Sequence, residues 1–190
     1  SAWANSLTPV QVTGLTSGVT SISSGYNATC AIKDGSAKCW GRNDAGRLGD
    51  NSTTYRSAPV QVTGLTAGVQ QLKIGSNSAC AIVNGAVKCW GYNNYGQLGD
   101  GTTTESHVPV QVVGVTSGAQ YVSVGESSTF AIINGVVKGW GSDSYGNLAK
   151  GTNNQGSATP VGAFGLNGSP MQLAMGLNHT CSIVGDNVQC

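Results

Sequence analysis

Residues 80–91 read Cys-Ala-Ile-Val-Asn-Gly-Ala-Val-Lys-Cys-Trp-Gly, and close copies of this stretch recur along the chain. Its Asn84-Gly85 pair predicts a two-residue type I′ hairpin turn, because both central residues of that turn need a positive φ, which Asn and Gly tolerate best. Counting outward from the turn places Cys80 opposite Cys89 in a non-hydrogen-bonded pair, where Cα atoms lie about 4.5 Å apart. Disulfides accept that separation, so the register predicts a cross-strand bridge.

The same spacing recurs around two more hairpin turns and pairs all six cysteines of the chain. The expected bridges are Cys30–Cys39, Cys80–Cys89 and Cys181–Cys190. The remaining copy of the hairpin has Phe130 and Gly139 at these two positions, so both cysteines are absent together. Zinc ligands are the alternative, but about two to four residues usually separate them, which is fewer than in any of these pairs. The spacing favours disulfides.

The hairpin belongs to a repeat that recurs along the whole chain. Segments related to Pro-Val-Gln-Val mark the successive units, at Pro9, Pro59, Pro109 and Pro160. We interpret residues 1–190 as one repeat domain, with units 9–58, 59–108, 109–159 and an incomplete 160–190. The segments within a unit are rich in Val, Ile, Thr and aromatic residues and are separated by Gly and Asn turns. This pattern predicts a four-stranded antiparallel sheet for each unit.

A four-stranded sheet of this size cannot bury both of its faces alone. Radial stacking lets each blade cover its neighbour, so the repeat predicts an all-β fold, a β-propeller of four-stranded antiparallel blades. The chain would supply about four blades, half or more of a ring. A β-solenoid is the alternative, but its coils are usually shorter and lack a hairpin in each turn. Trp40, Trp90 and Trp140 recur at one position and are expected to pack between blades.

The motif from Gly75 to Thr102, Gly-x₄-Cys-Ala-Ile-x₂-Gly-x-Val-Lys-Cys-Trp-Gly-x-Asn-x₂-Gly-Gln-Leu-Gly-Asp-Gly-Thr, resembles the repeats of the regulator-of-chromosome-condensation family. The resemblance implies a seven-bladed propeller, and the paired cysteines are most similar to those of secreted bacterial members. Seven blades at this period need about 350 residues, so part of the circle is missing. Three explanations remain open: a fragment of a longer chain, two half-rings that pair into one propeller, or a compact four-bladed ring.

The composition of the chain restricts the binding partners and the cellular compartment that we expect. The formal charge is +1 and only 9% of the residues are charged, where globular domains usually carry about 25%. No basic stripe is present, which argues against nucleic acid as a partner. No apolar run reaches the roughly 18 residues of a membrane span. The start, Ser1-Ala-Trp-Ala-Asn, fits a mature, processed chain. Hairpin disulfides need an oxidising compartment, so we expect an extracellular, periplasmic or cell-surface protein.

The sequence offers little for catalysis. His107 and His179 occupy non-equivalent places outside any metal or nucleophile motif. We therefore expect no enzyme activity, no catalytic or metal-binding residues and no cofactor. The loops that begin at Asp50 and Asp100 offer oxygen ligands but too few carboxylates for calcium, and we interpret both loops as turns.

The loops that follow each Trp-Gly pair vary between units, while the scaffold around them repeats. Variable loops on a fixed scaffold commonly carry function, and Tyr and Arg are enriched in binding hot spots. Ordinary variation of exposed loops is the alternative. The candidate binding residues are Arg42, Arg47, Tyr92, Tyr95 and Tyr145.

Three functional hypotheses follow. The leading one is a secreted, disulfide-reinforced propeller that acts as a binding or assembly module and contacts another protein, or a second copy of itself, through loops at one rim. The second is a structural subunit of an extracellular or surface polymer in which open blade edges pair with neighbouring chains. The third, guanine-nucleotide exchange, is implied by the family resemblance alone and is disfavoured by an oxidising compartment.

Overall fold

The computed structural model describes residues 6–151, 155–163, 169–176 and 179–190, and these residues form fifteen β-strands. The described residues contain no helix, and therefore none that could cross a membrane. The strands form four antiparallel sheets, each built from consecutive strands of the chain. The all-β blade architecture expected from the repeat is confirmed.

Three blades have four strands and the last has three among the described residues. Blade 1 consists of β1 (Val19–Gly25), β2 (Ala28–Lys33), β3 (Ser36–Gly41) and β4 (Arg56–Gln61). Blade 2 consists of β5 (Val69–Ile74), β6 (Ser78–Val83), β7 (Ala86–Gly91) and β8 (Ser106–Gln111). Blade 3 consists of β9 (Ala119–Val124), β10 (Ser128–Ile133), β11 (Val136–Gly141) and β12 (Ser157–Gly162). Blade 4 consists of β13 (Pro170–Met175), β14 (Thr180–Val184) and β15 (Asn187–Gln189).

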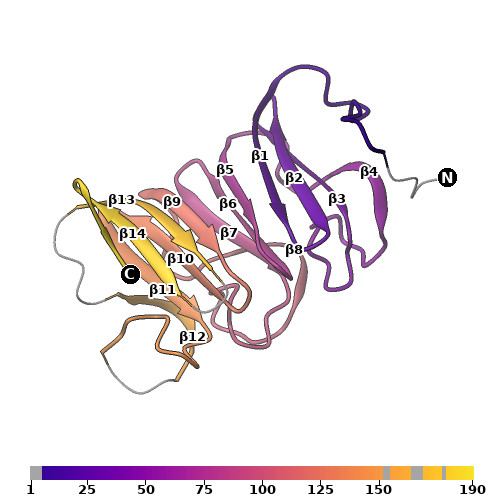
Figure 1. Ribbon diagram of the computed structural model, residues 1–190. Coiled ribbons are helices and arrows are strands. Elements are labelled where there is room, and N and C mark those ends of the chain that lie inside the picture. The colour runs from indigo at the N-terminus through magenta and orange to yellow at the C-terminus, as the bar shows by residue number, and fades with distance from the viewer. Residues whose placement is uncertain (1–5, 152–154, 164–168, 177–178) are drawn as a thin grey trace.

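The four blades stand side by side in one row, with blade 1 and blade 4 at its two ends (Figure 1). The first strand of each blade contacts the first strand of the next, so β1, β5, β9 and β13 are the inner strands. Among the described residues, apolar cores join blades 1 and 2, blades 2 and 3, and blades 3 and 4, but none joins blade 4 to blade 1, so the chain forms a partial propeller. A compact four-bladed ring, one of the three explanations left open by the sequence, is wrong for this chain.

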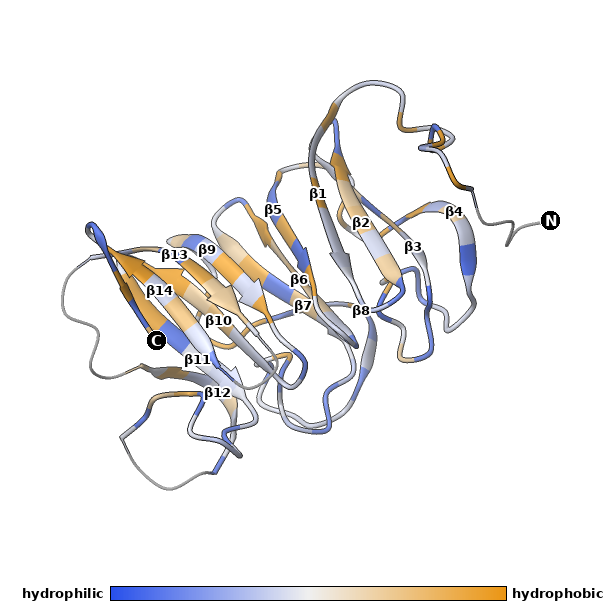
Figure 2. Cartoon of the chain, in the orientation of Figure 1, coloured by the Kyte–Doolittle hydropathy of each residue, from blue (hydrophilic) through white to orange (hydrophobic). Residues whose placement is uncertain are grey.

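Each pair of neighbouring blades shares one apolar core. Hydrophobic residues are concentrated along the strands and hydrophilic residues in the loops (Figure 2). Alternate residues of blade 1 pack against the facing side of blade 2, and alternate residues of blade 2 pack against blade 3 in the same way. The first of these cores contains Cys30, Ile32, Cys39, Leu72, Ile74 and Trp90. Burying these faces against each other supplies the hydrophobic stabilisation that a single sheet lacks.

The repeated tryptophans behave as expected for packing between blades. Trp90 and Trp140 are completely buried, each against the preceding blade. Their indole Nε1–H groups donate to the carbonyl oxygens of Arg47 and Gln97, each at 2.9 Å. Trp40 has no preceding blade among the described residues and is only half-buried. The exposure of the first tryptophan therefore follows from its place in the row.

The hairpin register predicted from the sequence is confirmed. Cys80 pairs with Cys89 across β6 and β7, and the turn residues Asn84 and Gly85 have φ values of 50° and 80°. All three expected disulfides are present, with Cα–Cα separations of 4.0, 4.1 and 4.1 Å. No free cysteine occurs in the described part of the chain. The first two bridges are completely buried beneath the following blade.

Blade 3 has a phenylalanine ring in the place of the disulfide bridge of blades 1 and 2. Phe130 lies opposite Gly139, as the register predicts, and the phenylalanine is 2% exposed. A Cβ atom added to Gly139 would lie 2.6 Å from Cε1 of Phe130, so the ring occupies the space that a side chain at position 139 would need. The two substitutions are therefore one coupled change.

The repeat units of the sequence are offset from the blades. Pro59 and Gln61, expected at the start of the second unit, lie in β4 and close blade 1 by pairing with β3. Gln61 also donates from Nε2 to the carbonyl oxygens of Ala37 and Leu65, at 2.9 and 2.8 Å, which fixes the connection to blade 2. The related segment at Pro9 forms no strand, because its pairing partner would belong to a preceding blade. Cross-strand hydrogen bonds, and not the repeat period, set the boundaries of a blade.

Replacing Gly139 tests the coupling with Phe130. We expect Gly139→Ala to lower the free energy of unfolding by about 1–3 kcal/mol, because the new methyl group overpacks the buried ring. Gly162→Ala is the control on the neighbouring strand, since nothing lies within 4 Å of its Cβ position. Urea denaturation of both variants measures the difference. Equal stability of the two would show that Phe130 does not fill this space.

Candidate functional site

Strand direction brings two sets of loops to the same end of the propeller. Within a blade, the first strand runs toward the turn that opens the second, and the third strand runs back to that end. We call this end the loop face. It comprises the short turns 25–27, 75–77 and 125–127 and the long loops 42–55, 92–105 and 142–151. In Figure 1 the long loops extend below the strands.

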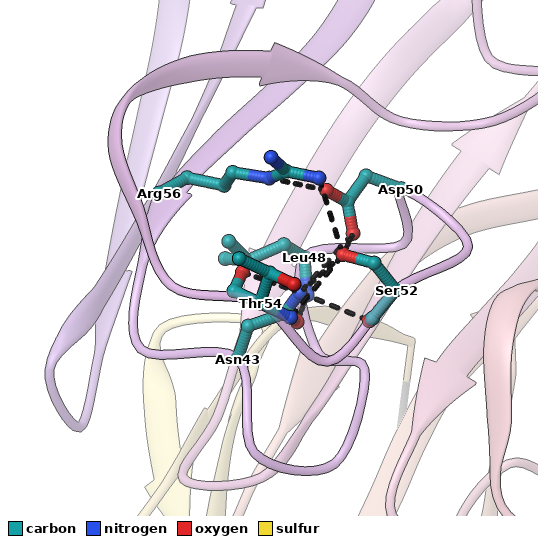
Figure 3. A network of polar contacts seen from close by, with 6 residues as sticks. All are labelled: Asn43, Leu48, Asp50, Ser52, Thr54 and Arg56. Atoms are coloured by element: carbon teal, nitrogen blue, oxygen red, sulfur yellow. Dashed lines mark hydrogen bonds and ion pairs between the residues drawn. The ribbon is translucent and has the colours of Figure 1, made fainter.

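A buried asparagine organises the first long loop (Figure 3). Asn43 accepts a hydrogen bond from the Leu48 N–H at 2.9 Å. Its Nδ2 group donates to Oδ1 of Asp50 at 3.1 Å and to the carbonyl oxygens of Ser52 and Thr54 at 3.0 and 3.1 Å. One side chain therefore ties together both halves of the loop.

The second long loop repeats this arrangement. Asn93 accepts from the Leu98 N–H at 2.9 Å and donates to the carbonyl oxygens of Thr102 and Thr104 at 3.1 and 2.9 Å. Its amide also reaches Oδ1 of Asp100 at 3.3 Å. The same scaffold thus supports different side chains at the tips of the two loops.

The Asp50 carboxylate is hydrogen-bonded within its own loop and to the first residue of β4. It accepts from Oγ of Ser52 at 2.7 Å and from Nε of Arg56 at 2.7 Å, in addition to Asn43. Burial opposes the charged form, but these hydrogen bonds outweigh it and hold the pKa of Asp50 below its usual value. Both oxygens serve the turn, in agreement with the interpretation of this loop from the sequence.

The third long loop keeps the hydrogen bond from the leucine N–H but has different residues at the other positions. Asp143 replaces the asparagine and accepts from the Leu148 N–H at 2.8 Å. An aspartate cannot donate to a second carboxylate, and position 150 carries lysine instead of aspartate. The Lys150 ammonium lies 3.3 Å from Oδ2 of Asp143, which is 1% exposed. An amide–carboxylate pair in two blades has become an ammonium–carboxylate pair in the third.

Arg47, expected to be an exposed binding residue, is buried, and the sequence-based expectation is corrected in this respect. Its guanidinium is 2% exposed and donates to the carbonyl oxygens of Tyr26 and Ser76 and, at 2.6 Å, to Oδ1 of Asn77. Tyr26 belongs to blade 1, whereas Ser76 and Asn77 belong to blade 2. Burial lowers the pKa of the guanidinium from its usual value. Arg47 therefore joins two blades beneath the loop face.

The other four candidate residues lie on the loop face. Arg42 is partly exposed, forms an ion pair with Asp44 and lies 5.9 Å from the ring centre of Tyr26. Tyr92 is half-buried and packs edge-on against Tyr95, with ring centres 6.3 Å apart. Tyr95 is 52% exposed and Tyr145 is 72% exposed.

Two further tyrosines on this face were missed from the sequence. Tyr26 lies in a short turn and is 62% exposed, and Tyr55 lies at the end of the first long loop and is 45% exposed. Inspection of the Trp-Gly loops alone could not find Tyr26. Counting strand directions would have found it, because the turn between β1 and β2 must lie at the same end as the loop between β3 and β4.

The two histidines do not join a common site. His107 lies 3.1 Å from a carboxylate oxygen of Glu105 at the surface of blade 2. His179 lies beside Gly176 in blade 4. Among the described residues, no group of three or more His, Cys, Asp or Glu side chains could hold a metal ion.

These features define a β-propeller with disulfide-reinforced blades and an aromatic loop face. The chain matches the model of the Regulator of chromosome condensation (RCC1) repeat over residues 34–82 and 84–132. Since these matches cover more than half of the chain, the chain belongs to the RCC1 repeat family. No curated protein matches it.

Several solved structures share the fold of this chain. Prp20p from Saccharomyces cerevisiae, described with its binding to Gsp1p and histones, superposes with a TM-score of 0.80 at 15% identity over 94% of this chain and 46% of its own. Yeast RCC1 (Prp20) bound to Kap60 gives 0.77 at 16% identity, over 93% and 44%. Human WBSCR16 gives 0.76 at 22% identity, over 88% and 45%. The chain thus spans less than half the length of each.

Removing the Arg47 guanidinium should weaken the contact between blades 1 and 2. We expect Arg47→Ala to lower the free energy of unfolding by about 2–4 kcal/mol, because buried carbonyl oxygens lose charge-assisted hydrogen bonds. Arg47→Gln introduces glutamine, the residue that blade 2 has at the equivalent position, and should lower the free energy of unfolding by less than Arg47→Ala. Arg42→Ala removes a partly exposed arginine of the same loop and is the control, with little change expected. Chemical denaturation measures all three. A loss for Arg47→Ala no larger than for Arg42→Ala would contradict the assignment.

Proposed function

We propose that this chain is part of a secreted, disulfide-reinforced RCC1-type propeller that binds another protein through its loop face. The observation that carries the proposal is the concentration of tyrosines there. Five of the six tyrosines in the chain belong to the loop face, and four of them are exposed: Tyr26, Tyr55, Tyr95 and Tyr145.

The loops are rigid supports for these rings. Asn43 and Asn93 fix the long loops of blades 1 and 2, because each asparagine forms hydrogen bonds with both halves of its loop. Because folding has already ordered the loops, a partner that binds there does not have to order them again. Tyrosine adds a large contact area at a small loss of side-chain freedom. Together these properties favour protein recognition over catalysis, and we propose no enzymatic role.

The solved relatives illustrate this use of the fold. Prp20p is described with binding to Gsp1p and histones, and Prp20 is seen bound to Kap60. At 15–16% identity the likeness concerns the fold, so we do not transfer these partners or guanine-nucleotide exchange to this chain.

The three disulfides support an oxidising location. Each links the two strands of a hairpin, and two of them are completely buried. Such bridges form and persist in extracellular or periplasmic space and at cell surfaces, and are rare in the cytosol. We therefore propose one of these three locations.

A second candidate function is assembly with further blades of the same kind. Blade 1 exposes Ile22, and leaves Trp40 partly exposed, on the side where a preceding blade would pack. Blade 4 exposes Val188 and the Cys181–Cys190 bridge on the side where a following blade would pack. Because the blades are copies of one unit, the exposed face of blade 4 is complementary to that of blade 1. A second copy of the chain, or further blades of a longer chain, would cover both faces. An extracellular polymer would use the same faces head to tail.

The proposal is tested by removing the rings. We expect a partner captured from surface extracts of the producing organism to bind Tyr92→Ala/Tyr95→Ala/Tyr145→Ala at least tenfold more weakly than the unchanged protein, as expected for hot-spot tyrosines. Val19→Ala/Val136→Ala removes two exposed apolar side chains at the strand ends opposite the loop face and is the control. Biosensor titration with the purified partner measures both affinities. Unchanged binding by the triple variant, with intact folding, would refute the proposal.

A further inference from the structure

A hollow of about 310 Å³ opens on the loop face between blades 2 and 3. Its walls come from three segments: the long loop of blade 2, the short turn of blade 3 and the long loop of blade 3. The residues that line it and matter for its chemistry are Tyr95, Glu126, Ser142, Tyr145 and Asn147.

Glu126 supplies a carboxylate that the scaffold does not use. The same turn position carries Tyr26 in blade 1 and Ser76 in blade 2, so the fold does not require an acid there. Glu126 is exposed, and no ion pair with it occurs among the described residues. By contrast, Asp50 pairs with Arg56 and Asp143 pairs with Lys150. Glu126 thus leaves negative charge at the hollow.

Asn147 is used within blade 3. Its Nδ2 group donates to Oγ of Ser128 at 3.1 Å, and its Oδ1 atom is buried and therefore closed to a ligand. The exposed Glu126 carboxylate supplies the negatively charged acceptor of the hollow, which calls for donors and positive charge.

Two aromatic rings line the hollow with Glu126. Tyr95 and Tyr145 are both more than half exposed, and they come from different blades. The face of a tyrosine ring attracts a cation, more often arginine than lysine. A planar guanidinium also donates to a carboxylate through two parallel N–H groups and still offers further donors.

We infer that this hollow binds an arginine side chain of the partner protein. The inference rests on the proposed function and adds the chemistry of the partner: a segment that presents an arginine to Glu126, with the guanidinium against the tyrosine rings that line the hollow. A lysine satisfies the charge but lacks the planar fork, so it binds more weakly.

Short peptides test the site without knowledge of the partner. The probes are acetyl-Gly-Gly-Arg-Gly-Gly-amide and the same peptide with citrulline, which keeps the shape of arginine but loses its charge. Titration into ¹⁵N-labelled protein is followed by NMR. We expect the arginine peptide to shift the amide signals of Tyr95, Glu126 and Tyr145 in a saturable manner, and the citrulline peptide to bind at least tenfold more weakly. Equal binding of both peptides, or no localised shift, would overturn the inference.

Variants identify the acceptor. Glu126→Gln should weaken the arginine peptide at least tenfold, because it removes the charge while keeping the size of the side chain. Tyr145→Ala should weaken it about threefold, as expected for an exposed cation–π contact. Asp186→Asn, which removes an acid from the exposed turn between β14 and β15, is the matched control and should bind normally. Normal binding by Glu126→Gln would contradict the proposed site.

The two proposals fail in different ways. A partner that depends on Tyr92, Tyr95 and Tyr145 but binds Glu126→Gln normally would leave the protein-binding face in place and refute the arginine site. A saturable arginine-peptide site together with a partner that ignores the tyrosine variant would refute the binding face as the contact with that partner.

Discussion

Contact between neighbouring blades is the interaction on which the rest of this structure depends. A sheet of four short strands has two faces and too little material to bury either of them by itself. In blades 1 and 2 the following blade covers the side of the hairpin that carries the cysteines, and Trp90 and Trp140 pack against the preceding blade. The hairpin disulfides hold individual sheets in register, but stacking removes their apolar faces from water. Arg47 adds polar hydrogen bonds between two blades at the point where their turns meet.

The loop face is a consequence of this stacking. Because the blades are related by the repeat, their long loops reach one end of the propeller and lie beside each other. Buried Asn43 and Asn93 fix the loops from within, which frees their tips to vary. Variation has placed tyrosines at several tips and an unpaired acid, Glu126, between two of them. The scaffold thus separates the residues that maintain the fold from those available to a partner.

The parts of the fold that the sequence predicts are those determined by local chemistry. The Asn84-Gly85 turn and the alternation of the strands fix the pairing of Cys80 with Cys89, so the disulfides could be derived without a structure. The boundaries of the blades could not, because the pairing of β4 with β3 depends on hydrogen bonds between segments that a long loop separates.

For the same reason, the positions of the candidate binding residues in the structure could be predicted only in part. Tyr95 and Tyr145 lie on exposed loop tips, as their positions after a Trp-Gly pair suggest. The environment of Arg47 is set by Ser76 and Asn77, about 30 residues further along the chain in another blade, so its burial has no local signal. Glu126 was overlooked because a single acid in a short turn gains meaning only beside rings from two different loops.

Disulfide accessibility tests the central role of blade stacking most directly. Cys30–Cys39 and Cys80–Cys89 are completely buried beneath the next blade, whereas Cys190 of the third bridge is exposed. Thiol–disulfide exchange requires access to a sulfur atom, so mild reduction of the folded protein, followed by alkylation and mass mapping, should open Cys181–Cys190 first. The other two bridges should persist until the protein unfolds. Reduction of all three at one rate under native conditions would contradict the stacked arrangement.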